Sequence, residues 1–266
     1  ANGRRVRSST VACLLLVLAA NACGHEPTTG RWRACAPPPA TEMVTVPAGP
    51  FTFGDNQGAV DAKPAREVTL ASFSIDKYAV TAAEYACCLG ARACDERDVR
   101  TSPGEGCTLG AAGKGAHPIN CVTYGGARSY CEWVGRRLPT EQQWEKTARG
   151  ASARTFPWGE QPPHGRANCL PGVCGENHPV TAPVAAFGNS ASPHGAVQLA
   201  GNVWQWVDAW YRGNHDGEAS VPVAPRTWRV LRGGSWREHD DALRTTSRHY
   251  LKPGSALHNV GFRCAR

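Results

Sequence analysis

The chain has 266 residues, of which 41% are hydrophobic and 19% are charged, and its formal net charge is +7. This balance excludes a disordered polyelectrolyte, and the apolar runs are shorter than the ~20 residues of a membrane-spanning helix. Basic residues are scattered rather than blocked, so the sequence predicts no nucleic-acid partner.

Residues 1–22 have the composition of a secretory signal peptide. Three arginines precede the apolar run Val11–Ala20, and Ala20-Asn21-Ala22 ends the segment. Cys23 follows directly, so this end is similar to a bacterial lipobox, although Leu is expected where Ala20 stands. We expect export to the bacterial cell envelope with lipidation of Cys23, as in an outer-membrane lipoprotein. Plain secretion is the alternative.

A linker and one domain are expected after the signal. Residues 23–41 begin at the cysteine of the lipid anchor and are rich in proline, which predicts a linker. From Glu42 to Arg266 the composition is globular, with neither an internal repeat nor a second linker. The sequence therefore predicts a single domain over 42–266.

The first half of this domain predicts strands and then helices. Alternating apolar residues predict a strand and a turn over Val44–Phe53, and further strands over 68–75. Capping boxes at Thr81–Glu84 and Thr140–Gln143 predict two helices, and a third helix is expected to begin near Thr123.

The second half predicts mostly loops. After Gly150 the loops are interrupted at Val203–Tyr211, and Val230–Trp236 is expected to form a core strand. Helices that precede irregular β structure indicate an α+β fold, with disulfides compensating for sparse regular structure.

The cysteines fit an oxidising compartment. The chain has 12, and ten remain when Cys13 of the leader and Cys23 are set aside. None of them has the spacing of a zinc finger, so we expect disulfides, with a redox or metal site as the alternative. Cys88 and Cys94, and likewise Cys169 and Cys174, flank short loops and predict small disulfide loops; Cys107 and Cys121 are also expected in disulfides, and the partners of Cys35, Cys87, Cys88 and Cys94 are left open.

Several motifs occur in a fixed order over almost all of residues 42–266. They are Pro47-Ala48-Gly49-Pro50-Phe51, Gly135-Arg136-Arg137-Leu138-Pro139-Thr140-Glu141, Phe156-Pro157-Trp158-Gly159, Ala200-Gly201-Asn202-Val203-Trp204, Arg232-Gly233-Gly234-Ser235-Trp236 and Gly261-Phe262-Arg263-Cys264. Together they closely resemble the formylglycine-generating, sulfatase-modifying family. The resemblance implies a C-type-lectin-like fold, low in regular secondary structure, and a disulfide between Cys131 and Cys264.

The copper site of that family is not matched. Its oxidases hold Cu(I) with two cysteines that follow Arg-Gly-Gly-Ser, and Cu(I) prefers such soft thiolates to oxygen ligands. The corresponding residues here are Glu238 and Leu243. We therefore expect neither copper nor ordinary formylglycine synthesis.

Other residues at positions that match the family's active site are retained. Trp204, Ser235 and His239 are candidate catalytic residues together with Glu238; the alternative is that Trp204 belongs to the core and Ser235 caps a turn. The acidic run that begins at Glu238 offers ligands for iron or calcium with His249 and His258 downstream, whereas most charge runs are solvated loops.

Calcium is a second property that the resemblance implies. One family site resembles Asn168 and Glu176 as side-chain ligands, with the carbonyls of Cys169 and His178. A polar pair in a loop is the alternative for the two side chains. The second family site needs an amide and a carboxylate where this chain has two glutamines, Gln198 and Gln205, so calcium is expected to bind there far more weakly.

Two functions compete on this evidence. The first is a binding or accessory module for a protein or glycan at the cell envelope, attached to the membrane only through its lipid anchor. The alternative is an O2-dependent oxidase that uses a different metal or site, like the pyoverdine-maturation relatives, which also lack the copper cysteines. Trp228, Trp236 and Tyr250 are candidates for lining a cleft, and packing in the core is their alternative role.

Overall fold

The computed structural model describes residues 31–33, 35, 41–175, 178–215 and 226–266. The predicted signal peptide 1–22, Cys23, most of the predicted linker and Glu176 lie outside the described residues. None of the helices in the described stretches is long and apolar enough to cross a membrane.

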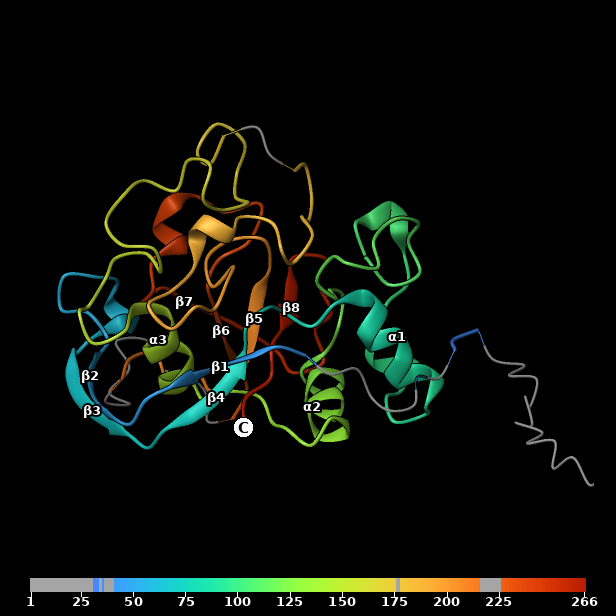
Figure 1. Ribbon diagram of the computed structural model, residues 1–266, viewed down its shortest axis with the longest axis horizontal. Coiled ribbons are helices and arrows are strands. Elements are labelled where there is room, and N and C mark those ends of the chain that lie inside the picture. The colour runs from blue at the N-terminus through green and yellow to red at the C-terminus, as the bar shows by residue number, and fades with distance from the viewer. Residues whose placement is uncertain (1–30, 34, 36–40, 176–177, 216–225) are drawn as a thin grey trace, which may run out of the picture.

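Two antiparallel strand pairs follow one another along one side of the molecule (Figure 1). β1 (Met43–Val46) pairs with β4 (Phe73–Asp76), and β2 (Gly49–Phe53) pairs with β3 (Arg66–Leu70). The strand and turn expected over Val44–Phe53 are confirmed, and each half of that segment pairs with a later strand. The break between β1 and β2 falls where the chain reaches a glycine with a φ of +131°.

The three α-helices in the described residues each begin after a threonine whose hydroxyl caps the first turn. α1 (Ala82–Gly90) and α3 (Glu141–Arg149) have the expected capping boxes, built on Thr81 and Thr140. The threonine before α2 (Tyr124–Trp133) accepts a hydrogen bond from the third backbone N–H of that helix. The three predicted helices are therefore confirmed. Short 3₁₀ turns cover Val60–Ala62, Glu96–Asp98, Pro103–Glu105, Gly188–Ser190 and Asp240–Leu243.

A four-stranded sheet occupies the C-terminal part in the order β7-β6-β5-β8. The strands are β5 (Trp204–Trp210), β6 (Arg229–Arg232), β7 (Arg248–Leu251) and β8 (Val260–Phe262). β8 runs parallel to β5, and the other neighbours are antiparallel.

The core strand expected over Val230–Trp236 is wrong in its second half. β6 ends at Arg232, because Gly233 and Gly234 adopt φ values of +97° and +73° that extended strands do not use. A Cβ atom on Gly233 would lie 2.6 Å from the carbonyl oxygen of Leu199, so this close approach requires glycine.

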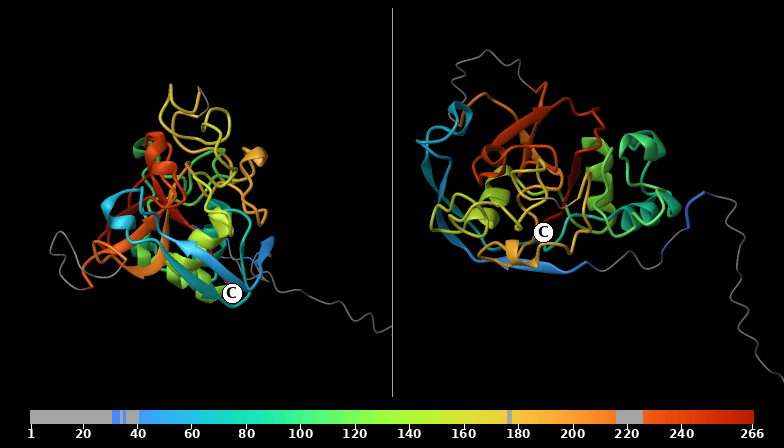
Figure 2. Two further views of the ribbon diagram at one scale, coloured as in Figure 1. Left: turned by 90° about the vertical axis from the view of Figure 1, so that its left-hand side faces the viewer. Right: turned by 90° about the horizontal axis from the view of Figure 1, so that it is seen from above.

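The apolar core has two main parts. α1 and α2 pack with the ends of β5 and β8, where Tyr85, Tyr130 and Phe262 are buried. α3 buries Trp144 against Leu199 and its neighbours in a second cluster. The segments 151–175 and 178–200 are mostly loops, coloured yellow-green to gold in Figures 1 and 2.

Five disulfides connect the described residues. They are Cys35–Cys87, Cys88–Cys94, Cys107–Cys121, Cys131–Cys264 and Cys169–Cys174, so the pairing that the sequence left open becomes defined. Trp32, which also lies in the predicted linker, donates from Nε1 to Glu96 Oε1 at 2.8 Å. This part of the predicted linker is therefore fastened to the domain.

Candidate functional site

A cleft of about 530 Å³ opens where β5 begins, between the turn before β7 and the loop that follows β2. Its walls come from three separate stretches of chain, residues 57–59, Trp204 and residues 238–249. The lining residues are Gln57, Gly58, Ala59, Trp204, Glu238, Asp241, Ala242, Arg244, Thr246, Ser247, Arg248 and His249.

Three of the four candidate catalytic residues meet at this cleft. Glu238 Oε1 accepts hydrogen bonds from Trp204 Nε1 and from Ser235 Oγ, both at 3.2 Å. Ser235 is fully buried and in turn accepts from Asn259 Nδ2 at 3.2 Å. The Glu238 carboxylate is therefore held at the cleft wall by donors that are themselves fixed in the core.

His239 lies apart from these three residues. It is exposed, precedes the 3₁₀ turn Asp240–Leu243 and does not line the cleft. Leu243, at the second family copper position, is completely buried and packs with Cys169, Cys174 and their apolar neighbours. The two family copper positions therefore place a carboxylate at the cleft and an isobutyl group in the core.

His249 forms part of the same wall, and its ring lies 5.3 Å from the Trp204 ring at an interplanar angle of 32°. Loss of hydration lowers the pKa of His249 below its ordinary value, while Glu238 and Asp61 act in the opposite direction. His249 therefore holds a proton less strongly than a free imidazole does.

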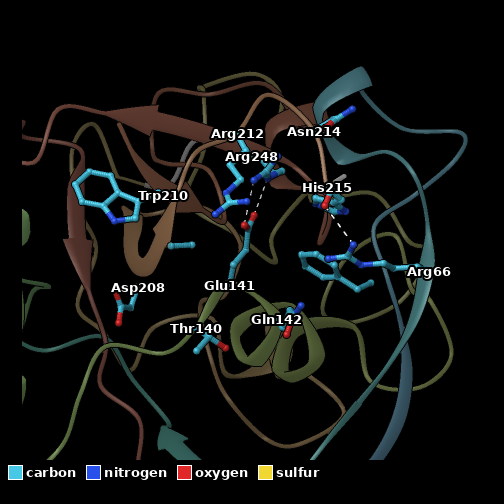
Figure 3. Close-up of a pocket in the computed structure, with 12 residues that line it drawn as sticks. Arg66, Thr140, Glu141, Gln142, Asp208, Trp210, Arg212, Asn214, His215 and Arg248 are labelled. Atoms are coloured by element: carbon cyan, nitrogen blue, oxygen red, sulfur yellow. Dashed lines mark hydrogen bonds and ion pairs between the residues drawn. The ribbon is translucent and has the colours of Figure 1, made fainter. Parts of the chain in front are cut away.

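Arg248 lies between the cleft and a buried ion-pair network. This residue was not predicted from the sequence. Its guanidinium forms a two-point pair with Glu141, from Nε to Oε1 at 2.6 Å and from Nη2 to Oε2 at 3.1 Å (Figure 3). Burial alone would raise the pKa of Glu141, but Arg248 and Arg232 outweigh it and lower this pKa to about 2. No sequence motif joins residues 107 positions apart, so no sequence signal identifies this pair.

A second, smaller cavity of about 230 Å³ lies on the other side of Arg248, at the start of α3 (Figure 3). His215 stacks on Phe53 there with 4.0 Å between ring centroids, and its backbone oxygen accepts from Arg66 Nη1 at 3.2 Å. Burial lowers the pKa of His215 to about 3, with the neighbouring Arg248 as the next cause. None of the four candidate catalytic residues lines this cavity.

The first calcium position has an oxygen atom without a partner. Asn168 is buried, its Nδ2 donates to the Val180 carbonyl at 2.6 Å, and its Oδ1 has no hydrogen-bond partner among the described residues. Cys169 and His178 are described, whereas Glu176 lies outside the described residues. An amide oxygen of this kind is among the oxygen ligands that Ca²⁺ prefers.

The second calcium position is occupied by amide hydrogen bonds. Gln205 Oε1 accepts from Trp144 Nε1 at 2.9 Å and from Arg263 Nε at 2.8 Å, and Gln205 Nε2 donates to the Gln198 carbonyl. Arg263 Nη2 also donates to that carbonyl, at 3.2 Å. The oxygens at this position already accept hydrogen bonds, two of them from the Arg263 guanidinium, so the residues present do not fit a cation.

The acidic run does not assemble a metal site with the downstream histidines. Over the stretches that the structure describes, no group of three or more His, Cys, Asp or Glu side chains is placed to hold a metal ion. His258 lies beside Trp236, with 5.5 Å between ring centroids, and its Nε2 contacts Arg237. For the described residues the arrangement favours a solvated acidic loop over an iron or calcium site at Glu238–Asp241.

The aromatic residues Trp228, Trp236 and Tyr250 do not line the cleft. Trp228 and Tyr250 pack edge-to-face at 5.3 Å, and Tyr250 also contacts Tyr211 at 4.2 Å. Trp228 and Trp236 are half-buried, and Tyr250 is exposed to solvent. The cleft takes its rings from Trp204 and His249 instead.

Comparison with known proteins defines the class. Residues 32–266 match the model of the sulfatase-modifying factor enzyme 1-like domain. The formylglycine-generating enzyme of Streptomyces coelicolor is 32% identical over 87% of this chain and 91% of its own length. The chain belongs to the formylglycine-generating, sulfatase-modifying family, which confirms the family and the fold expected from the motifs.

Other relatives differ in length and in name. The kinase Pkn1 of Chlamydia pneumoniae is 35% identical over 86% of this chain, but the chain spans only 38% of that protein. A bovine relative named inactive C-alpha-formylglycine-generating enzyme 2 is 30% identical over 89% of this chain and 92% of its own length. The structure of PvdO from Pseudomonas aeruginosa superposes with a TM-score of 0.71 at 30% identity, covering 85% of this chain and 94% of PvdO.

Proposed function

We propose that this chain is a member of the family without copper-dependent formylglycine synthesis, and that its cleft serves as a binding site in a binding or accessory module. One observation carries the proposal: all ten cysteines that the structure describes are in disulfides. A disulfide sulfur is no thiolate, so these residues offer Cu(I) none of the soft anionic ligands it prefers.

The side chains at the two copper positions support the same conclusion. Glu238 offers a hard oxygen ligand that Trp204 and Ser235 already hold, and the buried Leu243 offers none. The cleft volume of about 530 Å³ lies within the range of ordinary ligand sites, which is about 300–1,000 Å³. A relative of nearly the same length that bears the name inactive shows that such proteins occur in this family.

The test is a direct assay of formylglycine synthesis. The full chain is incubated with Cu(I), O2 and a sulfatase-type peptide that contains cysteine, beside the Streptomyces coelicolor enzyme as a positive control. We expect no aldehyde by mass spectrometry from this chain. A clear aldehyde product that depends on the chain would contradict the proposal.

The alternative of an oxidase with another metal or site is supported by the retained hydrogen-bond chain from Asn259 through Ser235 to Glu238. The similarity to PvdO at 30% identity also supports an unusual member of the family. Elemental analysis before and after a chelator wash separates the two functions. Tightly held iron or copper would favour the oxidase, and its absence would favour the binding module.

We also propose export and an envelope location. Five disulfides are typical of proteins that fold in an oxidising compartment, which supports export. Lipidation of Cys23 is the finer part of the proposal, and it rests on the lipobox-like sequence alone. The wild-type chain should partition into detergent and Cys23→Ser should not. Equal partitioning of the two would reject the lipid anchor.

Calcium is the cofactor that the residues support. Asn168 Oδ1 and the carbonyls of Cys169 and His178 would hold the ion, with Glu176 as the expected carboxylate. The disulfide Cys169–Cys174 closes this loop and restricts it before any ion arrives. Bound calcium would stabilise the loop rather than take part in chemistry at the cleft.

A further inference from the structure

A short stretch before the domain, residues 31–33 and 35, lies beside α1 (Figures 1 and 2). The half-buried Trp32 ring packs against the apolar cluster of α1 and α2, and its Nε1 donates to Glu96 Oε1 at 2.8 Å. A Cβ atom on Gly110 would lie 3.3 Å from Cη2 of this ring, so the indole also fits closely against the chain there. These residues of the predicted linker therefore form part of the surface of the domain.

One covalent bond completes this attachment. Cys35 is bonded to Cys87, which lies in the last turn of α1. The helix is fixed by other contacts as well, because Tyr85 is completely buried and Cys88 is bonded to Cys94. The bond between Cys35 and Cys87 therefore fastens the N-terminal stretch to a helix that has its own attachments to the domain.

This disulfide is more accessible than the other four that connect the described residues. Cys35 and Cys87 are both half-buried. The other eight cysteines in these disulfides are all buried, with exposed fractions between 0% and 8%. A disulfide is reduced when a thiolate reaches one of its sulfur atoms, and exposed disulfides are the labile ones. A reductant in the solvent therefore reaches Cys35–Cys87 first.

The non-covalent contacts between this stretch and the domain are weak. Within the described residues, Trp32 contributes one exposed hydrogen bond and the packing of one half-buried ring. Ordering the stretch costs backbone entropy at every residue, and contacts of this kind offset little of that cost. We therefore expect the stretch to leave the domain when the disulfide opens.

The domain itself stays attached to the chain from Thr41 onward. Thr41 Oγ1 donates to Asp76 Oδ1 at 3.1 Å, and β1 begins two residues later. β1 is in turn paired with β4 over its whole length. Opening the bond at Cys35 therefore frees the chain only as far as Thr41.

We propose that the disulfide Cys35–Cys87 is a reducible clasp, a site of thiol–disulfide exchange that a dithiol reductant opens and that sets the length of the tether between Cys23 and the domain. The tether length rests on the proposed lipid anchor at Cys23, whereas the clasp itself does not. With the clasp closed, residues 24–31 separate Cys23 from Trp32, and with the clasp open, residues 24–40 separate it from Thr41. Extended chains of these lengths span about 30 Å and about 60 Å. The closed clasp therefore keeps the domain near the membrane, and the open clasp about doubles its reach.

The opening step is an exchange that balances. A thiolate of the dithiol attacks one sulfur of the clasp, the bond between the two cysteines breaks, and the other cysteine leaves as a thiolate that takes up a proton. The second thiolate of the reductant then displaces the first cysteine, which is also protonated. Two electrons pass from the dithiol to the clasp, and the dithiol becomes a disulfide.

The first experiment measures the order in which the disulfides open. The oxidised full chain is exposed to dithiothreitol for increasing times, free thiols are blocked with N-ethylmaleimide, and the labelled peptides are identified by mass spectrometry. We expect Cys35 and Cys87 to be labelled at least about tenfold faster than the other eight cysteines. Labelling of another pair first, or of all pairs at one rate, overturns the proposal.

The second experiment measures the release of the stretch. Trypsin cleaves mobile chain, and the bond after Arg33 lies between Trp32 and Cys35, which are both fastened when the clasp is closed. We expect cleavage after Arg33 to be at least about tenfold faster in Cys35→Ser/Cys87→Ser than in the wild type. The wild type opened by brief treatment with dithiothreitol should behave like this variant, which keeps the test valid if the variant folds poorly.

Two further variants separate the clasp from its surroundings. Trp32→Ala keeps the disulfide, so cleavage after Arg33 should rise only about two- to threefold. Cys88→Ser/Cys94→Ser removes the neighbouring disulfide of the same helix and is the matched control, which should cleave like the wild type. Melting curves verify that each variant is folded. A closed clasp that is cleaved as fast as the open one overturns the proposal.

The third experiment measures the reach of the tether. Neutron reflectometry of the lipidated full chain on a phosphatidylcholine bilayer gives the separation between the domain and the surface. We expect this separation to be limited to about 30 Å in the oxidised wild type and to extend to about 60 Å in Cys35→Ser/Cys87→Ser. Equal separations overturn the proposed tether. The two experiments in solution need neither lipidation nor an assigned activity, so failure of the lipid anchor or an aldehyde product would be recognised separately.

Discussion

Two regions of this molecule are stabilised by different forces. The region around α1 and α2 holds four of the five disulfides and an extended apolar cluster. The region around α3, β6 and β7 holds a buried network of charged side chains and only the disulfide Cys169–Cys174. Disulfides therefore stabilise the region where the chain enters the domain, and ion pairs stabilise the region beneath the cleft.

The buried side chains of the charged region neutralise one another's charges. Arg232 is completely buried and bonds to Glu141 at 2.8 Å and to Glu145 at 2.7 Å, while Glu145 also takes Arg149 at 3.1 Å. Burying such charges is costly, and only their mutual pairing compensates for it. The comparison therefore predicts that acid, or a single substitution that neutralises one charge, destabilises this region. Reductants should destabilise the disulfide region.

The largest effect is expected for Glu145→Gln. Glu145 is fully buried and accepts from Arg232, Arg149 and the Gly54 N–H, so its loss leaves buried guanidinium charge uncompensated. We expect a loss of about 3–5 kcal/mol in the free energy of unfolding, measured by urea titration. Glu132→Gln, which removes an exposed pair with Arg128, should cost only about 0–0.5 kcal/mol. Equal losses for the two variants would refute the role of the buried network.

The disulfide region is tested by Cys131→Ser. The bond from Cys131 to Cys264 joins α2 to the end of the chain across 133 residues. Its removal should lower the free energy of unfolding by about 2–5 kcal/mol and leave one reactive thiol at Cys264. Thiol labelling of the unfolded variant followed by intact-mass measurement counts that thiol. A variant without a newly reactive thiol would show that the bond does not form.

The sequence predicts the helices better than the late strands, in both regions. α1 and α3 are readable because Thr81 and Thr140 stand three residues before a side chain that completes a capping box. Such signals are local. β7 and β8 are short and lack alternation, and they become strands only through pairing with β6 and β5. The extent of β6 was overestimated because the backbone angles of Gly233 and Gly234 depend on neighbours far away in the sequence.

The same distinction between local and long-range signals applies to the candidate site. Trp204 and Ser235 are identifiable because they lie within family motifs, and Glu238 because it stands at a family copper position. His239 belongs to the same stretch, but the turn that begins after it leaves it exposed and away from the cleft. The pair between Arg248 and Glu141 could not be predicted, since it joins two segments that only tertiary packing brings together. Residue types alone do not show which charges neutralise one another.

Acid should disturb the charged region first. The pKa of Glu141 is about 2 in the folded chain against 4.5 for a free carboxyl, so its stabilisation is complete above pH 4.5 and is lost as the pH falls towards 2. This loss is roughly 3 kcal/mol.

The pKa of His215, lowered from 6.5 to about 3, acts in the same direction. The unfolded chain takes up this proton first, so stability falls as the pH drops below 6.5. Urea midpoints should be constant above pH 7 and decline steadily between pH 6 and 3. His215→Phe should flatten the upper part of that decline only in part, because the pKa of His117 is also lowered, to about 4. A flat profile down to pH 3 would contradict the assigned pKa shifts.

The smallest effect concerns the loop closed by Cys169–Cys174, where one covalent bond and one ion would act together. Calcium that binds only the folded chain raises stability by about 2.7 kcal/mol when its concentration is a hundredfold above Kd. We expect added Ca²⁺ to raise the melting temperature of the wild type and a chelator to reverse the rise.

Asn168→Ala should abolish this response, because it removes the buried Oδ1, which has no other partner among the described residues. Asn168→Asp should retain it, since a carboxylate oxygen can replace the amide oxygen, although both variants lose the bond from Nδ2 to Val180. That shared loss makes the pair of variants matched. If Asn168→Ala responded to calcium like the wild type, the ion would bind elsewhere. The buried Oδ1 of Asn168 would then destabilise the loop, and the disulfide alone would hold the loop in place.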